Sequence, residues 1–273
     1  MEARTVFFVS DGTGITAETF GHSVLTQFDL RFKQIRLPFI DTLAKAHNAV
    51  REINHSFEKD GKRPIVFSTL VKANLSAVIR LSKGMHMDLI HTFVEPLEQE
   101  LGVKSTHTIG RSHNIADSDA YKNRIEAINF SLAHDDGQSD KNLTAADVIL
   151  VGVSRSGKTP TCLYLAMQYG IFAANYPLTE DDLESRNIPR ALESCAQKLF
   201  GLTIKPDRLQ QIRNERRPDS RYSSPGQVAF EVRAAESLFE RHGIPFIDAT
   251  ECSIEEMSSR ILDRTGIERR LRP

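Results

Sequence analysis

The chain is poor in cysteine, and its three cysteines form no recognisable pair. Cys162, Cys195 and Cys252 are widely spaced, without a CxxC motif, and one disulfide would leave a thiol over. Disulfide-stapled secreted domains and structural zinc sites need more cysteines or closer ones. The histidine pairs also lack the helical spacing of zinc ligands. We therefore expect a protein of a reducing cytoplasm that holds no zinc.

Long hydrophobic runs and an excess of either charge are absent as well. No apolar run approaches the roughly 18 residues of a membrane span, and the opening MEARTVFFVSDG lacks the features of a signal peptide. The 35 Lys and Arg against 36 Asp and Glu leave a net charge of -1. No overall field then favours nucleic acid or an anionic membrane surface. We expect a soluble cytoplasmic protein that binds neither nucleic acid nor a membrane and recognises its partner through a local site rather than through its overall charge.

The 273 residues are enough for two lobes, each with its own core. In the first hundred residues short apolar runs alternate with helical patterns. Strands are expected at 4–10, 32–40, 63–70 and 87–94, and helices at 15–27, 42–58, 72–83 and 95–101. This alternation predicts a mostly parallel, doubly wound sheet in an N-terminal α/β lobe of residues 1–108.

A segment rich in Ser, Thr, His and Gly, residues 103–116, has no apolar stripe and is typical of a connector between lobes. A helix over 117–133 and strands at 147–152, 171–175, 199–204 and 244–248 follow it. The sequence therefore predicts a second α/β lobe, residues 109–273, made of a connector helix and a P-loop kinase-like nucleotide-binding lobe. Nothing in the pattern fixes the oligomeric state, so assembly into a homo-oligomer stays open.

The strongest motif is GVSRSGKT, which matches GxxxxGK[ST] between an apolar strand and a helix. It comprises Gly152, Val153, Ser154, Arg155, Ser156, Gly157, Lys158 and Thr159. In such loops successive backbone N–H groups form an anion nest, the lysine reaches terminal phosphate oxygens and the threonine can ligate Mg²⁺. A chance glycine turn is the alternative, but the flanking pattern favours a phosphate-binding loop.

Pro160 follows this loop directly. Proline suits the first turn of a helix, but it removes the N–H that the residue after the threonine normally offers to a nucleotide α-phosphate. Either the proline merely starts the helix, or the nucleotide binds in a register that does not need this donor.

Two other places could supply carboxylates. His134-Asp135-Asp136-Gly137 ends the 117–133 helix shortly before the loop strand, so Asp135 or Asp136 could be a general base, although DDG is also an ordinary exposed turn. Asp248 ends an apolar run and could hold Mg²⁺ together with Thr159, or it could simply cap the next helix.

The arginine-rich stretch PDRLQQIRNERRP contains Arg208, Arg213, Arg216 and Arg217. It could form a lid that clamps transferring phosphoryl oxygens, with Arg213 or Arg217 as the contact, or it could be a solvated helix face.

The first strand ends in Ser10-Asp11-Gly12-Thr13-Gly14. This loop is either a second anion site or a turn in which Thr13 or Thr16 caps the following helix.

Five blocks in order resemble the regulatory proteins of phosphoenolpyruvate synthase and of pyruvate, phosphate dikinase. They are VSDGTGITAETFGHSVLTQF, RIEAINFSLAHDDG, GVSRSGKTPTCLYLA, NYPL and IKPDRLQQIRNERRP, and the resemblance runs from residue 5 to about residue 265. It implies a bifunctional serine/threonine kinase and phosphorylase. Such an enzyme uses ADP to phosphorylate and inactivate its target on a threonine. It removes that phosphate with inorganic phosphate, releasing pyrophosphate.

The resemblance makes residues 152–159 the ADP loop and phosphoenolpyruvate synthase the favoured target, with the dikinase as the alternative. An ADP-using kinase must project the β-phosphoryl rather than a γ-phosphoryl. If the nucleotide slides by one phosphate, the α-phosphate enters the nest beside Lys158 and the missing N–H of Pro160 costs nothing. A small-metabolite kinase and a nucleotide sensor without catalysis remain as rival hypotheses.

Overall fold

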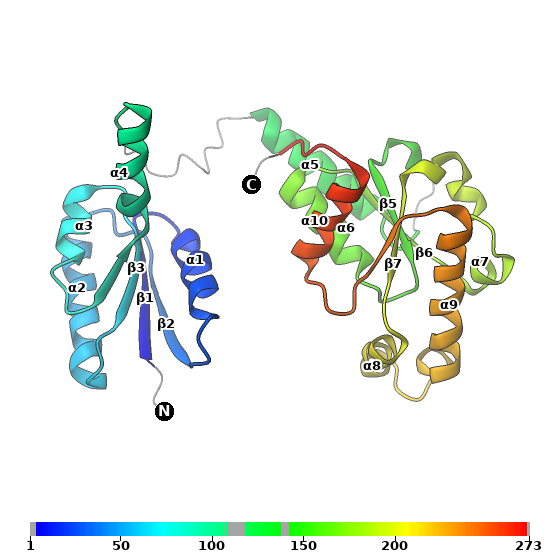
Figure 1. Ribbon diagram of the computed structural model, residues 1–273, viewed down its shortest axis with the longest axis horizontal. Coiled ribbons are helices and arrows are strands. Elements are labelled where there is room, and N and C mark those ends of the chain that lie inside the picture. The colour runs from blue at the N-terminus through cyan, green and yellow to red at the C-terminus, as the bar shows by residue number, and fades with distance from the viewer. Residues whose placement is uncertain (1–3, 107, 109–117, 138–141, 272–273) are drawn as a thin grey trace. The chain divides into compact units, whose positions relative to one another are not determined.

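The computed structural model describes residues 4–106, 108, 118–137 and 142–271 (Figure 1). Internal contacts divide the chain into two compact units, residues 1–114 and 115–273. Most of the predicted connector, and the predicted boundary after residue 108, lie outside the described residues. No helix in the described part of the chain has the length and apolar composition needed to cross a bilayer.

The N-terminal unit is a parallel four-stranded sheet with the strand order β2-β1-β3-β4. Its strands are β1 (Arg4–Ser10), β2 (Phe32–Leu37), β3 (Ile65–Thr69) and β4 (Met85–Asp88), and its helices are α1 (Ile15–Leu25), α2 (Leu43–Asp60), α3 (Ala73–Ile79) and α4 (Leu89–Leu101). The predicted alternating α/β organisation is confirmed. The strand predicted at 87–94 is wrong: it ends at Asp88, whose carboxylate accepts a hydrogen bond from the N–H of His91 and caps α4.

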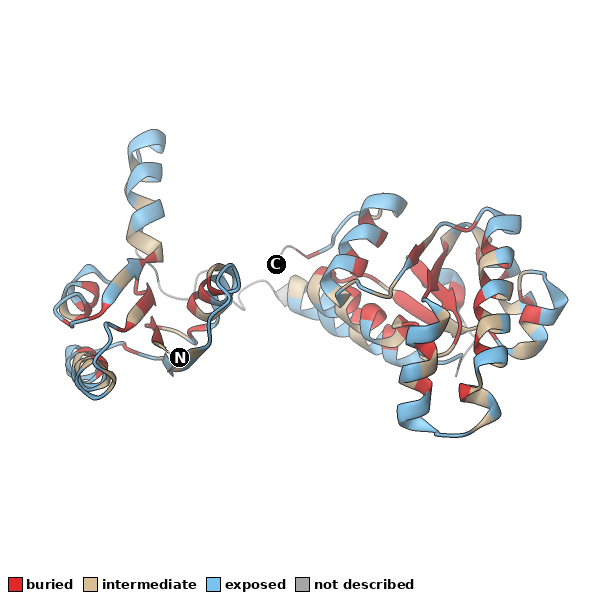
Figure 2. Ribbon diagram, turned by 60° about the horizontal axis from the view of Figure 1, so that its bottom comes forward, coloured by how far each residue is buried: buried red, intermediate tan, exposed pale blue. Residues whose placement is uncertain are grey.

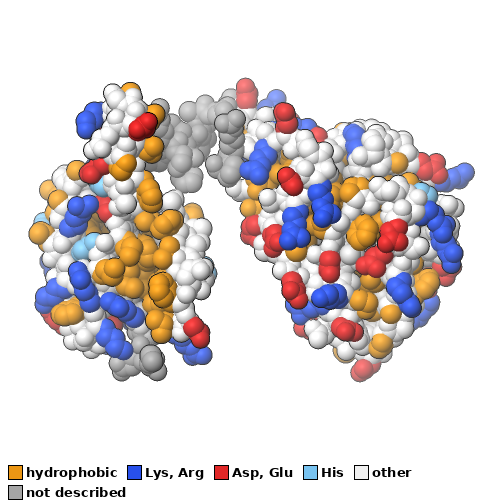
Figure 3. Space-filling view, in the orientation of Figure 1, with side chains coloured by type: hydrophobic (Ala, Val, Ile, Leu, Met, Phe, Trp, Pro, Cys, Tyr) orange, Lys and Arg blue, Asp and Glu red, His pale blue; other side chains and the backbone are white. Residues whose placement is uncertain are grey.

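Alternation along β1 supplies both cores of this unit. Phe7 and Val9 pack with residues of α2 and α3, whereas Val6 and Phe8 pack with residues of α1. Figure 2 shows the buried residues concentrated in the strands and on the sheet-facing sides of the helices. In Figure 3 hydrophobic side chains gather on one face of this unit.

The 10–14 loop at the end of β1 has internal hydrogen bonds. Asp11 accepts a bond from the N–H of Val71 at 2.7 Å, and the Ser10 hydroxyl accepts one from Gly12 at 3.1 Å. Gly14 is the N-cap of α1 and no side chain caps this helix, so the expected cap by Thr13 or Thr16 is wrong.

The C-terminal unit holds a second parallel sheet with the order β6-β5-β7-β8. Its strands are β5 (Val148–Gly152), β6 (Ala173–Pro177), β7 (Leu199–Thr203) and β8 (Phe246–Asp248). Its α-helices are α5 (Ser118–Ala133), α6 (Lys158–Tyr169), α7 (Glu180–Ser185), α8 (Pro206–Arg216), α9 (Pro225–His242) and α10 (Ile254–Thr265). Its 3-10 helices are η2 (Leu143–Ala145), η3 (Arg190–Lys198) and η4 (Arg221–Ser223). The predicted second α/β lobe is therefore confirmed.

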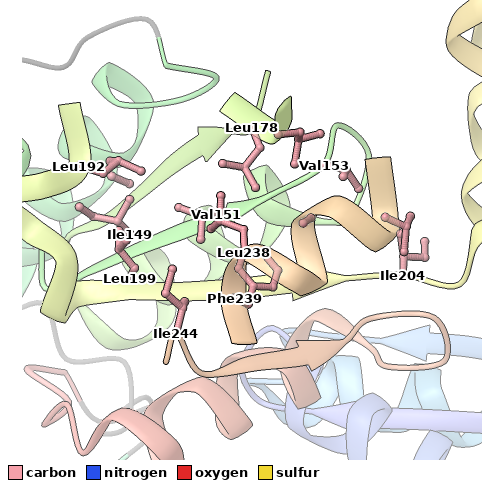
Figure 4. Close-up of a cluster of buried hydrophobic side chains, with 14 of the residues drawn as sticks. Ile149, Val151, Val153, Leu178, Leu192, Leu199, Ile204, Leu238, Phe239 and Ile244 are labelled. Atoms are coloured by element: carbon pink, nitrogen blue, oxygen red, sulfur yellow. The ribbon is translucent and has the colours of Figure 1, made fainter. Parts of the chain in front are cut away.

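Two hydrophobic clusters fix the sheet of the C-terminal unit. Figure 4 shows the first, in which Ile149 and Val151 of β5 pack with Leu199, Leu238 and Phe239. On the other face of the sheet, residues of α6 and α10 form the second cluster. Each fully buried aliphatic or aromatic side chain contributes roughly 1.5–3 kcal/mol. Because β5 is held from both faces, the loop at its carboxyl end starts from a rigid base.

Candidate active site

The 152–159 loop connects the end of β5 to the start of α6. A Cβ on Gly152 would lie 2.3 Å from the carbonyl oxygen of Leu202, a backbone atom that cannot move aside. Gly157, the N-cap of α6, has φ +91°, and Arg155 has φ +76°. These left-handed residues fold the loop back over the helix N-terminus, the geometry that points backbone N–H groups at an anion.

Lys158 is buried within this loop, with only 4% of its surface exposed. Its Nζ donates a hydrogen bond to the carbonyl of Val153 at 2.7 Å. Burial lowers the pKa of Lys158 to about 8, and the nearby charge of Asp136 partly opposes that shift. An anion in the loop would restore the charged form, so this lysine is sensitive to what the loop holds.

The turn after α5 brings two carboxylates beside the loop. The His134 ring stacks on Phe130 at 4.1 Å between ring centroids, and its Nδ1 donates to the carbonyl of Phe130 at 2.8 Å. Asp136 and Gly137 then adopt φ +50° and +66°, which turns the chain back toward β6. The DDG sequence predicted this turn. The turn lies next to α6, where Asp135 contacts Thr159, and this is the place that a general base or a metal ligand must occupy.

Asp135, Asp136, Thr159 and Asn175 form one hydrogen-bonded cluster. The Thr159 hydroxyl donates to Asp135 at 2.8 Å. The Asn175 side-chain amide lies 2.6 Å from the same Asp135 oxygen, 2.9 Å from the Thr159 hydroxyl and 3.2 Å from Asp136. Asp135 is half-buried, whereas Asp136 is exposed. The two aspartates, equivalent in the sequence, therefore have different surroundings.

Sequence reasoning missed Asn175. The available signal was a polar residue inside an apolar strand, two positions before its carboxyl end, within the NYPL block.

A pocket of about 230 Å³ opens over the loop. Its lining combines loop residues with the acid turn, β6 and α8: Asp136, Ser154, Arg155, Gly157, Lys158, Thr159, Pro160, Asn175, Ile212 and Arg216. A second pocket of about 200 Å³ is lined by Ser154, Arg216, Arg217 and Tyr222, so the two pockets share Ser154 and Arg216. Within the described residues, neither Arg216 nor Arg217 forms an ion pair.

Arg213 differs from the other arginines of α8. It is fully buried, and its guanidinium donates to the carbonyls of Ser154 and Tyr222 and, at 2.6 Å, to Glu231 of α9. The expected contact of Arg213 with phosphoryl oxygens therefore does not fit, because its donors are already occupied. Arg213 instead fixes α8 against the carbonyl of Ser154, so that Arg216 and Arg217 project beside the loop.

Asp248 is not beside Thr159. It ends β8, which β7 separates from β5, and its carboxylate accepts hydrogen bonds from the N–H and the hydroxyl of Thr250. It does not cap α10 either, since Ser253 does. Strand order, which the sequence does not reveal, makes the expected pairing of Asp248 with Thr159 wrong.

The carboxylate that contacts Thr159 is that of Asp135, which accepts a hydrogen bond from the Thr159 hydroxyl at 2.8 Å. No group of three or more His, Cys, Asp or Glu in the described ranges could hold a metal ion by itself. Mg²⁺ takes few protein oxygens and completes its octahedron with phosphate and water, so a threonine hydroxyl with a neighbouring carboxylate is a donor set that suits it.

Known proteins match this chain over nearly its whole length. A family model described as kinase/pyrophosphorylase matches residues 6–262. A protein of Herminiimonas arsenicoxydans is 70% identical over 268 residues, which cover 98% of this chain and 95% of that protein. A protein of Janthinobacterium sp. (strain Marseille) is 68% identical over 97% of this chain and 94% of its own length. Both bear the provisional name of phosphoenolpyruvate synthase regulatory protein. With nearly its whole length matched, the chain belongs to the kinase/pyrophosphorylase family.

Proposed function

We propose that this protein regulates phosphoenolpyruvate synthase by phosphorylating and dephosphorylating it on a threonine. In the kinase direction the threonine hydroxyl attacks the β-phosphorus of ADP, and AMP leaves. In the other direction inorganic phosphate attacks the phosphothreonine phosphorus, giving free threonine and pyrophosphate. The names of the relatives and the kinase/pyrophosphorylase family support this proposal. The observation that carries it is the pair of adjoining pockets at the 152–159 loop.

The two reactions need the same arrangement of two phosphorus atoms. The α-phosphate of ADP in one reaction corresponds to inorganic phosphate in the other, and the β-phosphoryl corresponds to the phosphoryl group on threonine. We assign the first position to the loop and Lys158, and the second to the side of Arg216 and Arg217. One site can then run both reactions, because both pass the same phosphoryl group between a threonine oxygen and a phosphate oxygen.

Pro160 supports this register. It lies exposed in the first turn of α6 and lines the pocket of the loop, where it offers no N–H. An α-phosphate in the nest beside Lys158 does not need that donor. A structure with ADP bound would test the register, and a β-phosphate in the nest with the α-phosphate beside Pro160 would contradict it.

The surrounding side chains divide the chemistry. Asp136, exposed to the pocket, accepts the proton of the threonine hydroxyl and returns it in the reverse reaction. Lys158 and the two arginines carry positive charge toward the phosphoryl oxygens. Mg²⁺, with Thr159 and Asp135 beside it, would supply further positive charge to the phosphates when bound.

The affinity for ADP should fall as the pH rises through about 8. Free protein loses the Lys158 proton near pH 8 because burial lowers this pKa, whereas bound phosphate favours the charged lysine. Between the free and bound pKa values the Kd should rise about tenfold per pH unit, and binding should take up protons. Calorimetry between pH 7 and pH 9.5 in buffers of different ionisation heat measures both. K158R, whose guanidinium stays charged, should flatten the profile, and a flat wild-type profile would contradict the assignment.

Mass spectrometry of the partner tests the function directly. Purified phosphoenolpyruvate synthase, incubated with this protein and ADP, should gain one phosphate on a threonine and lose it when phosphate replaces ADP. Parallel incubation with pyruvate, phosphate dikinase identifies the alternative target. ATP turnover without a protein acceptor would indicate a small-metabolite kinase instead, and partner inhibition without modification would indicate a nucleotide sensor.

A double variant in the same experiment tests the role of the second pocket, which Arg216 and Arg217 line. R216A/R217A should lower kcat in both directions by about tenfold or more for each lost charge-assisted contact. The KM for phosphate should change by less than about threefold, because we assign free phosphate to the loop and not to these arginines. R208A is the matched control, because Arg208 lines neither pocket. A loss confined to the KM for phosphate would place free phosphate, rather than the target's phosphoryl group, beside these arginines.

A further inference from the structure

Asn175 donates from one amide nitrogen toward three oxygens. The residue is 2% exposed, and its Nδ2 lies 2.6 Å from Asp135, 2.9 Å from the Thr159 hydroxyl and 3.2 Å from Asp136. A side-chain amide has only two hydrogens, so it cannot serve three acceptors fully. The Thr159 hydroxyl also donates to Asp135, so Asp135 receives two short hydrogen bonds. Asp136 receives only the longest contact of the amide, which the amide shares with the other acceptors.

The other end of the same amide is unsatisfied. Asn175 Oδ1 is buried and has no hydrogen-bond partner among the described residues. Turning the amide over would place the oxygen 2.6 Å from the Asp135 carboxylate, and the Thr159 hydroxyl could donate to it only by giving up its bond to Asp135. A buried acceptor without a donor is costly and rare in native proteins. Its presence here indicates that the position is shaped by the need for an amide donor toward the two acids.

The backbone of Asn175 binds the same turn. Its N–H donates to the carbonyl of His134 at 2.9 Å, and its carbonyl accepts from the N–H of Gly137 at 3.3 Å. These two bonds flank Asp135 and Asp136 on either side. One residue of β6 therefore fixes both the path of the turn and the direction of its carboxylates.

We propose that Asn175 is a positioning residue that gives the two aspartates separate tasks. Its amide holds Asp135 against Thr159 and leaves Asp136 free to face the pocket and the incoming hydroxyl. The inference deepens the proposed function and rests on it. The role requires a neutral donor. An aspartate at 175 would repel both acids, and an alanine would leave both acids without the hydrogen bonds that orient them.

The activities and thermal stabilities of two variants separate positioning from packing. N175A should lower kcat roughly a hundredfold, the cost of misplaced reacting groups, with the KM for ADP changed by less than about threefold because the loop still binds the nucleotide. N175D keeps the shape of asparagine but adds a charge, so its kcat should lie below that of N175A. A residue that merely packs would lower kcat in both variants only as far as it lowers their thermal unfolding midpoints. Wild-type kcat in a folded N175A would overturn the proposal.

A double-mutant cycle adds a second test. In a D136N background N175A should cost less than about threefold in kcat, because the base whose position it sets is already gone. Independent, multiplying losses would refute the coupling.

Side-chain amide NMR tests the geometry without any turnover. The Asn175 NH₂ protons should exchange slowly with solvent and shift in D135N, but not in D263N, which changes an exposed acid on α10. Fast exchange, or no shift in D135N, would overturn the inference even if the variants above fail to fold. If the wild type adds no phosphate to its target, the proposed function fails while this measurement still judges Asn175.

Discussion

Replacing Lys158 by methionine is expected to abolish both the phosphorylation of the target and its phosphorolysis, by a thousandfold or more, while the protein stays folded. Removing one preorganised charge from beside a transferring group costs about a hundredfold to a thousandfold, and Lys158 would also bind the α-phosphate of ADP or the inorganic phosphate held in the loop. Lys158 is 4% exposed and burial lowers its pKa to about 8, so the folded state already disfavours its charge. Methionine has a similar length without that penalty.

The measurement compares the two single-turnover rates with the thermal unfolding midpoint. K158M should keep a midpoint at or above that of the wild type, and K122M, a change on the exposed surface of α5, should keep both activities. Retention of full phosphorolysis by K158M would show that the two reactions use separate sites. Loss of both activities together with an unfolded protein would instead make Lys158 a structural residue.

Local patterns in the sequence were sufficient for most of the fold. The apolar run of β5, the GVSRSGKT loop and the helix after it are consecutive in the chain, so one stretch contains the whole motif. The parallel sheets follow from strands alternating with helices. The error at 87–94 has a local cause too: the sequence LIHTFV continues the apolar run, but the carboxylate of Asp88 caps the helix at that point.

Features that depend on strand order could not be predicted. Asp248 follows an apolar run as a metal-binding carboxylate would, yet β8 is an edge strand and β7 intervenes. Arg213 and Arg217 look alike in RNERR, but Arg213 lies inside α8 and is buried against Glu231, whereas Arg217 is the C-cap, where the backbone leaves the helical conformation, and is exposed. Asn175 becomes significant only because β6 pairs with β5 and so lies beside the turn after α5.

Replacing Asp136 by asparagine should lower the rate of threonine phosphorylation by about a hundredfold to ten-thousandfold, the range for a lost general base. The affinity for ADP should stay the same or improve, because a negative charge is removed from beside the phosphates. Phosphorolysis should fall as well, since the group that takes the hydroxyl proton must return it to the threonine oxygen. The isosteric D135N should instead act mainly on the Mg²⁺ requirement and the KM for ADP, because Asp135 is bound to Thr159.

The charge on Lys158 supplies an independent check of the same variant. Asp136 is the strongest of the nearby charges that support the proton of Lys158, so D136N should move the pKa of that lysine below about 8. The pH at which ADP affinity begins to fall should then shift downward in D136N, and less in D135N. If D136N keeps wild-type turnover while D135N loses it, the general base is Asp135, and the division of tasks between the two aspartates is reversed. If the affinity profile of D136N does not move, Asp136 does not face the phosphate end of the pocket.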